Sequence, residues 1–274
     1  MSGDTKYFSG SNLVAAPPEA GGLLTLAYRT FGDSENPAVL MPSCYGGTLD
    51  DTLPFLYTSK DGTEAVLQGN FVIAYHMAAI FPDFVQHVVV LAGSARTSWH
   101  NWSFLEGPKA ALLNSIDFNG GLYTKPAMRG TAAFGRVYST WALSQEWFRQ
   151  HSWEKLGYNS LEEYLHKEWE FKEDANNLLC MLATWQKGDI SQFGPEEERG
   201  NLVNALGRIK AKVLVMPART DMYFPPEDSQ FEVQHLNNGR LRVIESIWGH
   251  LAGGGGGTKE DEEFIKKEVA EFLS

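Results

Sequence analysis

Two apolar segments that lie far apart in the sequence constrain the fold most. HVVVLAGSA (residues 87–95) and KVLVMPARTD (residues 212–221) each contain a continuous apolar run of strand length, which is typical of strands buried on both faces of a parallel sheet. Residues 23–33 and 38–43 favour two further strands, and residues 71–81 carry apolar side chains at helical spacing. This alternation of strand, loop, helix and strand predicts an α/β fold with a mostly parallel sheet.

Between the two segments the sequence has only helical periodicity. Seven of the eight tryptophans fall within residues 99–185, and aromatic stripes at helical spacing usually form a core, so this region should pack around a core of its own. We predict a helical lid over residues 98–205. It is inserted between an N-terminal half of the α/β core, residues 1–97, and a C-terminal half, residues 206–274.

Charge and cysteine content exclude several classes of partner. The net charge of −11 disfavours nucleic acid and anionic membrane surfaces. Cys44 and Cys180 are far apart, which argues against a disulfide or a cysteine-based metal site and favours a reducing compartment. The chain has no run long enough to span a membrane and no leader pattern at its start. We therefore expect a cytoplasmic protein that binds a small molecule and no metal.

Two residues at strand ends suggest acid–base chemistry. Asp221 ends the segment 212–221, and His250 ends RLRVIESIWGH (residues 240–250), which also favours a strand. A carboxylate after one strand and a histidine after the next is the second half of a Ser–Asp–His triad in α/β-hydrolase chain order. In such a triad the carboxylate fixes the histidine tautomer and stabilises the imidazolium. Asp221 and His250 are the candidate catalytic pair.

Other candidate site residues follow the two halves of the sheet. Cys44 and Tyr45 lie in a glycine loop after the strand at residues 38–43, where such folds place an oxyanion-hole amide. Cys44 and Ser94 are also the side chains that could replace a missing nucleophile, because both follow strand ends. A simple turn or a buried packing role is the alternative for each.

A family resemblance joins these motifs over nearly the whole chain. LAYRTFGD, PSCYGGT, AYHMAA, GSARTSWHNWSFLEG, PARTDMYFPPED and IWGHLAGG resemble the homoserine O-acetyltransferase-like branch of the α/β-hydrolase superfamily. The similarity is greatest to fungal members from toxin and secondary-metabolite clusters. The resemblance implies acyl transfer or ester hydrolysis on a small metabolite, with acyl-CoA as a co-substrate of the transferases and no bound cofactor. It also implies that Arg136 binds a substrate carboxylate.

The nucleophile of that family is absent from its expected position. The family motif is roughly GxSMGxQQAYHMAA, and its alignment on AYHMAA places Gln68 at the serine and Asn70 at the following glycine. No GxSxG, GxCxG or GxDxG occurs in the chain. Gln68 is only 25 positions after Ser43, whereas one βαβ unit alone takes about 30 residues. A block of the sheet is therefore expected to be missing together with the elbow, through a deletion or a mis-spliced gene.

Three interpretations follow from this departure. The chain is an acyltransferase or esterase by descent with impaired triad catalysis, a non-catalytic pseudoenzyme that keeps the lid and binds a small acid or ester, or a truncated product without a function of its own. The residues alone leave all three open.

Overall fold

The computed structural model describes residues 5–10, 24–28, 75–253 and 256–274. The predicted strand at residues 38–43, the loop with Cys44 and Tyr45, and Gln68 lie outside these ranges. Near the N-terminus, β1 (Lys6–Gly10) pairs antiparallel with β2 (Leu24–Tyr28), so part of the strand predicted over residues 23–33 is confirmed. Among the described residues, no helix has the length and apolar character needed to cross a bilayer.

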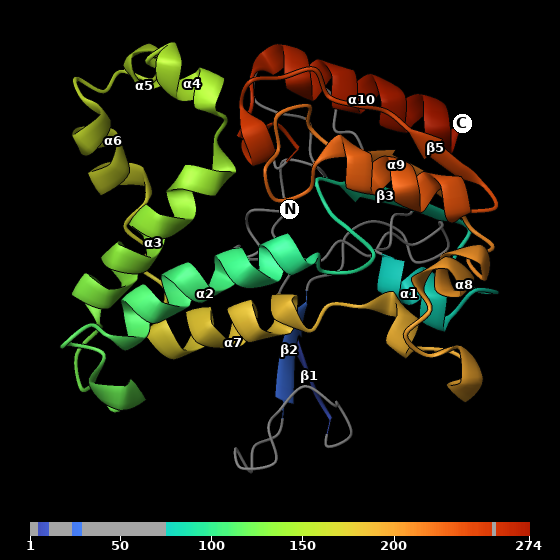
Figure 1. Ribbon diagram of the computed structural model, residues 1–274, viewed down its shortest axis with the longest axis horizontal. Coiled ribbons are helices and arrows are strands. Elements are labelled where there is room, and N and C mark those ends of the chain that lie inside the picture. The colour runs from blue at the N-terminus through green and yellow to red at the C-terminus, as the bar shows by residue number, and fades with distance from the viewer. Residues whose placement is uncertain (1–4, 11–23, 29–74, 254–255) are drawn as a thin grey trace.

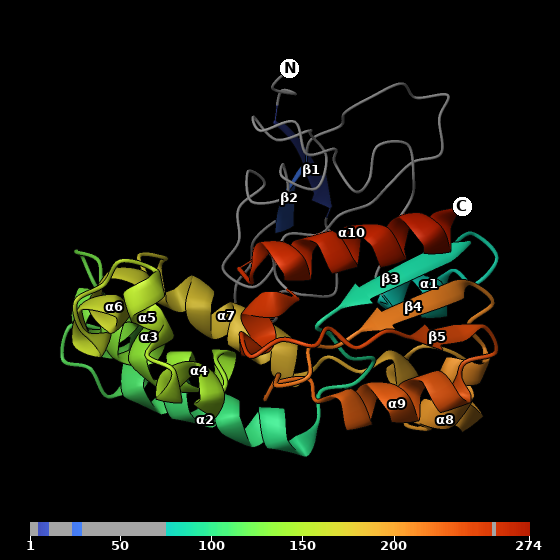
Figure 2. The same ribbon diagram turned by 90° about the horizontal axis from the view of Figure 1, so that it is seen from above.

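A three-stranded sheet confirms the predicted parallel arrangement. β3 (His87–Leu91) pairs in parallel with β4 (Lys212–Met216), which pairs in parallel with β5 (Gly239–Leu241). Because side chains alternate along a strand, Val88 and Val213 face α1 (Tyr75–Ile80) and α8 (Leu202–Gly207). Val89 and Leu214 face α10 (Lys259–Leu273) on the other side. The sheet lies between two helical layers, with α9 (Pro226–His235) on the face opposite α10 (Figure 2).

The last strand is shorter than the sequence indicates. Residues 240–250 favour a continuous strand, but β5 ends at Leu241 and pairing resumes only at the isolated bridge between Ala218 and Ile244. Pro217 separates β4 from this bridge and has no N–H to donate, which interrupts the hydrogen-bond ladder. Beyond the bridge the chain turns into the 3-10 helix η6 (Gly249–Ala252). This early end of the strand allows the chain to turn before His250.

Helices form the lid beyond the carboxyl ends of the strands (Figures 1 and 2). Four of them begin with a side chain that caps the helix N-terminus, namely Ser98, Ser144, Ser160 and Asp174, which satisfies an otherwise unpaired backbone N–H. Aromatic rings such as those of Phe134 and Trp147 form the lid's own core. The elements are α2 (Trp99–Leu113), η3 (Asn119–Gly121), α3 (Met128–Ala142), α4 (Gln145–Arg149), α5 (Ser152–Lys155), α6 (Leu161–Glu168) and α7 (Ala175–Gln186).

Three short elements follow α7 around residue 205, where the lid is predicted to end. After α7 come η4 (Ile190–Gln192), η5 (Glu196–Glu198) and α8. Ile190, Ala205 and Leu206 are buried in the cluster that contains Val88 and Val213 of the sheet. Helical periodicity alone did not separate them from the lid, because the helices on the sheet have the same period. The part of the insertion that packs away from the sheet ends with α7.

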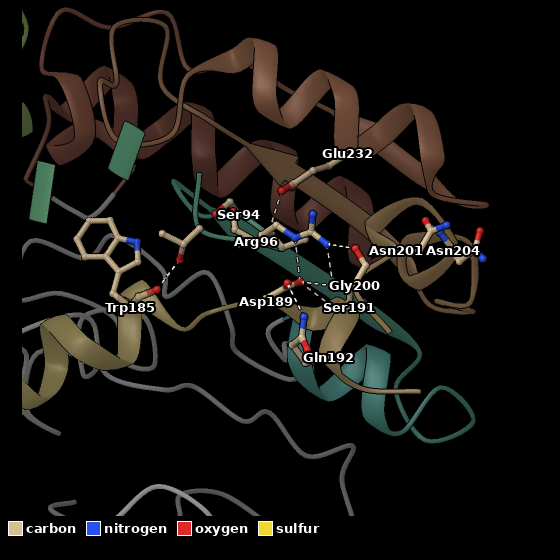
Figure 3. Close-up of polar contacts among 12 residues, drawn as sticks. Ser94, Arg96, Trp185, Asp189, Ser191, Gln192, Gly200, Asn201, Asn204 and Glu232 are labelled. Atoms are coloured by element: carbon tan, nitrogen blue, oxygen red, sulfur yellow. Dashed lines mark hydrogen bonds and ion pairs between the residues drawn. The ribbon is translucent and has the colours of Figure 1, made fainter. Parts of the chain in front are cut away.

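Two short segments, residues 95–97 and 188–190, connect the lid to the sheet and pair with each other; we call them the neck. The Thr97 N–H donates to the Gly188 carbonyl at 2.8 Å, and the Ile190 N–H donates to the Ala95 carbonyl at 3.0 Å. Between these bonds, Arg96 lies opposite Asp189, with 3.0 Å from Nε to Oδ1 (Figure 3). The Arg96 guanidinium also donates to Ser191 Oγ and to the Gly200 carbonyl, each at 2.7 Å.

A buried carboxyl joins the neck to α9. Glu232 Oε1 accepts a hydrogen bond from the Ala95 N–H at 2.7 Å (Figure 3), and the residue is 4% exposed. Burial raises the pKa of Glu232 to about 7, although the Ala95 N–H and the nearby Tyr75 hydroxyl favour the charged form. The carboxyl therefore resists ionisation until near-neutral pH.

Replacing Glu232 with Gln should change how stability depends on pH. The unfolded carboxyl loses its proton near 4.5 and the folded one near 7, so the parent becomes less stable as pH rises between these values. The contribution of Glu232 to the free energy of unfolding should fall by up to ~1.4 kcal/mol per pH unit, or about 3 kcal/mol over this interval. Glu232→Gln keeps the acceptor for Ala95 and should lose this component, as measured by urea unfolding at pH 5 and pH 7.5. The exposed Glu227→Gln is the control. Equal pH dependence in parent and Glu232→Gln would contradict the assignment.

Candidate active site

The carboxylate of Asp221 is fully buried and fixed by three contacts. A turn closed by the Asp221 N–H and the Ala218 carbonyl carries the residue past the end of β4. Oδ1 accepts hydrogen bonds from the N–H groups of Tyr223 at 2.8 Å and Phe224 at 3.1 Å. Oδ2 lies 2.9 Å from His250 Nδ1, and the side chain has no exposed surface. Hydrogen bonds of this kind stabilise a charged carboxylate where water is excluded.

His250 is oriented by the start of η6. Gly249 has φ +58°, and an added Cβ would lie 2.5 Å from the Ala142 carbonyl oxygen at the end of α3, so only glycine fits between the turn and the lid. The Gly249 N–H donates to Thr220 Oγ1 at 3.2 Å, and Thr220 donates to the Ser246 carbonyl at 2.8 Å. The residue beside Asp221 therefore also fixes the backbone beside His250.

The pair has the geometry that base catalysis requires. A hydrogen bond from Nδ1–H to Asp221 favours the tautomer in which Nε2 carries the free lone pair. The carboxylate would also stabilise the imidazolium that forms when Nε2 takes a proton. The His250 side chain is 27% exposed, and its Nε2 makes no hydrogen bond with a residue in the described ranges. No residue of the described ranges therefore occupies Nε2, the atom that would accept a proton in base catalysis.

Two aromatic rings lie against the imidazole. Tyr223 meets it edge-on with 4.9 Å between centroids, and Phe224 lies at 5.6 Å. Trp185, at the end of lid helix α7, stacks on Phe224 at 5.6 Å with 23° between the ring planes. The imidazole is therefore bordered by the rings of the two residues that bond Asp221 Oδ1.

Ser94 and Arg136, the other predicted site residues that the structure describes, make contacts elsewhere. The Ser94 hydroxyl donates to the Arg96 carbonyl at 2.9 Å, next to the neck (Figure 3), and no hydrogen bond links it to His250. Arg136 lies on α3 with 56% of its side chain exposed and forms an ion pair with Glu170 at 3.5 Å. Cys44 and Tyr45 lie outside the described residues. Of the predicted residues that the structure describes, only Asp221 and His250 contact each other.

Two residues near the pair were not singled out from the sequence. Thr220 directly precedes Asp221 and donates to the Ser246 carbonyl. Asn101 supports the residues after Asp221, because its amide donates to the Tyr223 carbonyl at 2.6 Å. The Thr-Asp dipeptide at the strand end is a weak signal for Thr220, whereas nothing in the helical pattern distinguishes Asn101 from a solvated polar residue. Within the described ranges, no group of three His, Cys, Asp or Glu side chains is arranged to hold a metal ion.

Sequence comparison identifies relatives of known activity. No protein-family model matches the chain. The chain is 35% identical over 182 residues to an ethyl acetate hydrolase from Pseudomonas veronii, a match that covers 65% of the chain and 51% of that protein. A homoserine O-succinyltransferase from Nitrosomonas europaea is 30% identical over 215 residues, which cover 70% of the chain and 56% of that protein. The chain thus spans about half the length of these curated relatives.

Two solved structures with a similar architecture are ester hydrolases by their names. The acetyl esterase MekB has a TM-score of 0.70 at 31% identity, covering 80% of this chain and 65% of that one. An acetylester hydrolase from Corynebacterium glutamicum has a TM-score of 0.83 at 24% identity, and the match covers 98% of this chain and 96% of that one. At this identity the likeness concerns the fold alone. The chain therefore belongs to the α/β-hydrolase superfamily, and its homologues there are esterases and homoserine O-acyltransferases.

Proposed function

We propose that this protein acts on a small uncharged ester, with His250 as the base and Asp221 as its orienting acid. The 2.9 Å contact between His250 Nδ1 and Asp221 Oδ2 carries the proposal. Nε2 would take a proton from the attacking hydroxyl, and the buried Asp221 would stabilise the resulting imidazolium. The choice between hydrolysis and transfer depends on whether water or another hydroxyl accepts the acyl group.

We infer that catalysis is weak in the chain as written. Gln68 stands at the nucleophile position of the resembled motif, and an amide side chain forms no acyl-enzyme. His250 is then left to activate water directly, a route without covalent catalysis. Enzymes that lose the nucleophile keep about 10³–10⁴-fold of rate over water from binding and the oxyanion hole. A small-molecule-binding pseudoenzyme is the second candidate function, favoured by the same substitution.

The surroundings of His250 support an uncharged substrate. The Phe224 ring lies beside the imidazole, and Trp185 stacks on Phe224; aromatic surroundings of this kind favour apolar acyl or alcohol groups. Arg136 is already paired with Glu170, which disfavours its predicted use as the grip for a substrate carboxylate. A homoserine acyltransferase that takes acyl-CoA as donor is the alternative, and it requires Arg136 to leave this pair.

The catalytic part of the proposal predicts weak, His250-dependent hydrolysis. The parent chain should hydrolyse 4-nitrophenyl acetate at most about 10⁴-fold faster than water. His250→Gln should remove the part of this rate that comes from activation of water by the imidazole and leave the part due to binding. Asp221→Asn should lower the His250-dependent part because the asparagine no longer stabilises the imidazolium. The exposed lid histidine variant His166→Gln should retain the parent rate. A fluorophosphonate probe should leave the parent unlabelled, and stoichiometric labelling of one site would overturn the claim that no serine nucleophile is present.

The substrate class is tested by binding, which needs no turnover. Phenylacetone, the ketone isostere of phenyl acetate, should bind the parent saturably by isothermal titration calorimetry. Trp185→Ala should weaken this binding by about tenfold, since a buried ring contact of this size contributes ~1.4 kcal/mol. Arg136→Met should leave it unchanged. Homoserine binding that Arg136→Met abolishes would instead favour the acyltransferase alternative.

A further inference from the structure

Tyr223 is in contact with both members of the acid–base pair. Its N–H donates to Asp221 Oδ1 at 2.8 Å, and its ring packs edge-on against His250 with 4.9 Å between centroids and 77° between planes. The residue is 1% exposed, so displacement of Tyr223 would disturb the hydrogen bond to the acid and the packing of the base together.

Two lid helices hold Tyr223 at opposite ends of the residue. Its carbonyl accepts from Asn101 Nδ2 on α2 at 2.6 Å. Its hydroxyl donates to the Tyr138 carbonyl on α3 at 2.8 Å. Both contacts are buried, and they join positions 122 and 85 residues apart in the sequence. The lid is thus connected to the backbone and to the side-chain tip of the same core residue.

These bonds are costly to break because their partners are out of water. Asn101 is 1% exposed and Tyr138 is 7% exposed. If the lid shifted without Tyr223, a carbonyl and a hydroxyl would lose their partners in a region of low dielectric, which is unfavourable for each group. A shift of α2 and α3 would therefore move Tyr223 with them.

We propose that Tyr223 couples the lid to the acid–base pair, and that Asn101 and Tyr223 are positioning residues for Asp221 and His250. The role of the pair in catalysis rests on the proposed function. The coupling itself does not, because it concerns only the geometry of the Asp221–His250 hydrogen bond. When α2 and α3 are docked, Tyr223 holds Asp221 Oδ1 and supports the imidazole; when they are loosened, the hydrogen bond weakens.

The proton between the two side chains reports this coupling without any need for activity. In protein labelled with ¹⁵N-histidine, the His250 Nδ1–H should give a downfield proton signal that is lost in His250→Gln, which assigns it among the seven histidines. Exchange of this proton with water should become about tenfold faster in Asn101→Leu and about threefold faster in Tyr223→Phe, because each variant removes one buried hydrogen bond. Thermal unfolding of each variant establishes that it is folded.

Matched controls separate coupling from general loosening of the lid. Tyr164→Phe removes the same atom from another buried lid tyrosine, which packs on Trp147. Asn114→Leu removes an amide that bonds within α2. Both should leave the exchange rate at the parent value, and equal acceleration in the controls would overturn the proposal.

The remaining outcomes distinguish this proposal from the proposed function. An unchanged rate in folded Asn101→Leu and Tyr223→Phe would refute the coupling and leave the pair intact. If Asn101→Leu does not fold, Tyr223→Phe decides alone, because it removes a single oxygen atom. Absence of the proton in the parent would refute the pair, and with it both proposals. A present and coupled proton in a chain without esterase activity would refute only the catalytic role.

Discussion

Complete burial of the Asp221 carboxylate is the constraint on which the site depends. A charged group without exposed surface requires hydrogen-bond partners around it, and here they come from the next residues of its own loop and from His250 in η6. These partners fix the backbone of residues 223–224 and the imidazole of His250. The turn at Thr220 then links the same loop to the chain before His250.

Contacts with the lid concentrate on the loop that follows Asp221 and on the turn before His250. Asn101 and Tyr138 hold Tyr223, while the end of α3 approaches Gly249 so closely that a side chain is excluded. The helices are therefore part of the support of the acid–base pair as well as a cover over it. This arrangement gives a physical reason for a large aromatic core in the lid: Phe104 and Tyr138 pack directly against Tyr223, so rigidity in the lid is transmitted to the site.

Much of the architecture could be predicted from the sequence, because apolar runs and helical periodicity reflect local burial. The strands at residues 87–91 and 212–216 and the helix at 75–80 follow from such patterns, whereas the choice of Asp221 and His250 as neighbours follows from the order of acid and histidine along the chain. The early end of β5 was missed because it depends on Pro217, which follows the adjacent strand β4. Asn101 and the pairing of Arg96 with Asp189 were missed because their partners are distant in sequence, so no local pattern marks them.

The neck has a consequence for how this fold can vary. Because Thr97 bonds Gly188 and Ala95 bonds Ile190, the insertion leaves and re-enters the α/β core at one point. Segments whose two ends lie together can be lengthened, shortened or exchanged without a change in the register of the strands that flank them. The lid helices between the two ends can therefore be replaced as one unit. Replacement by another helical insertion would preserve the core segments that carry Asp221 and His250, provided that the new insertion supplied its own contacts to Tyr223.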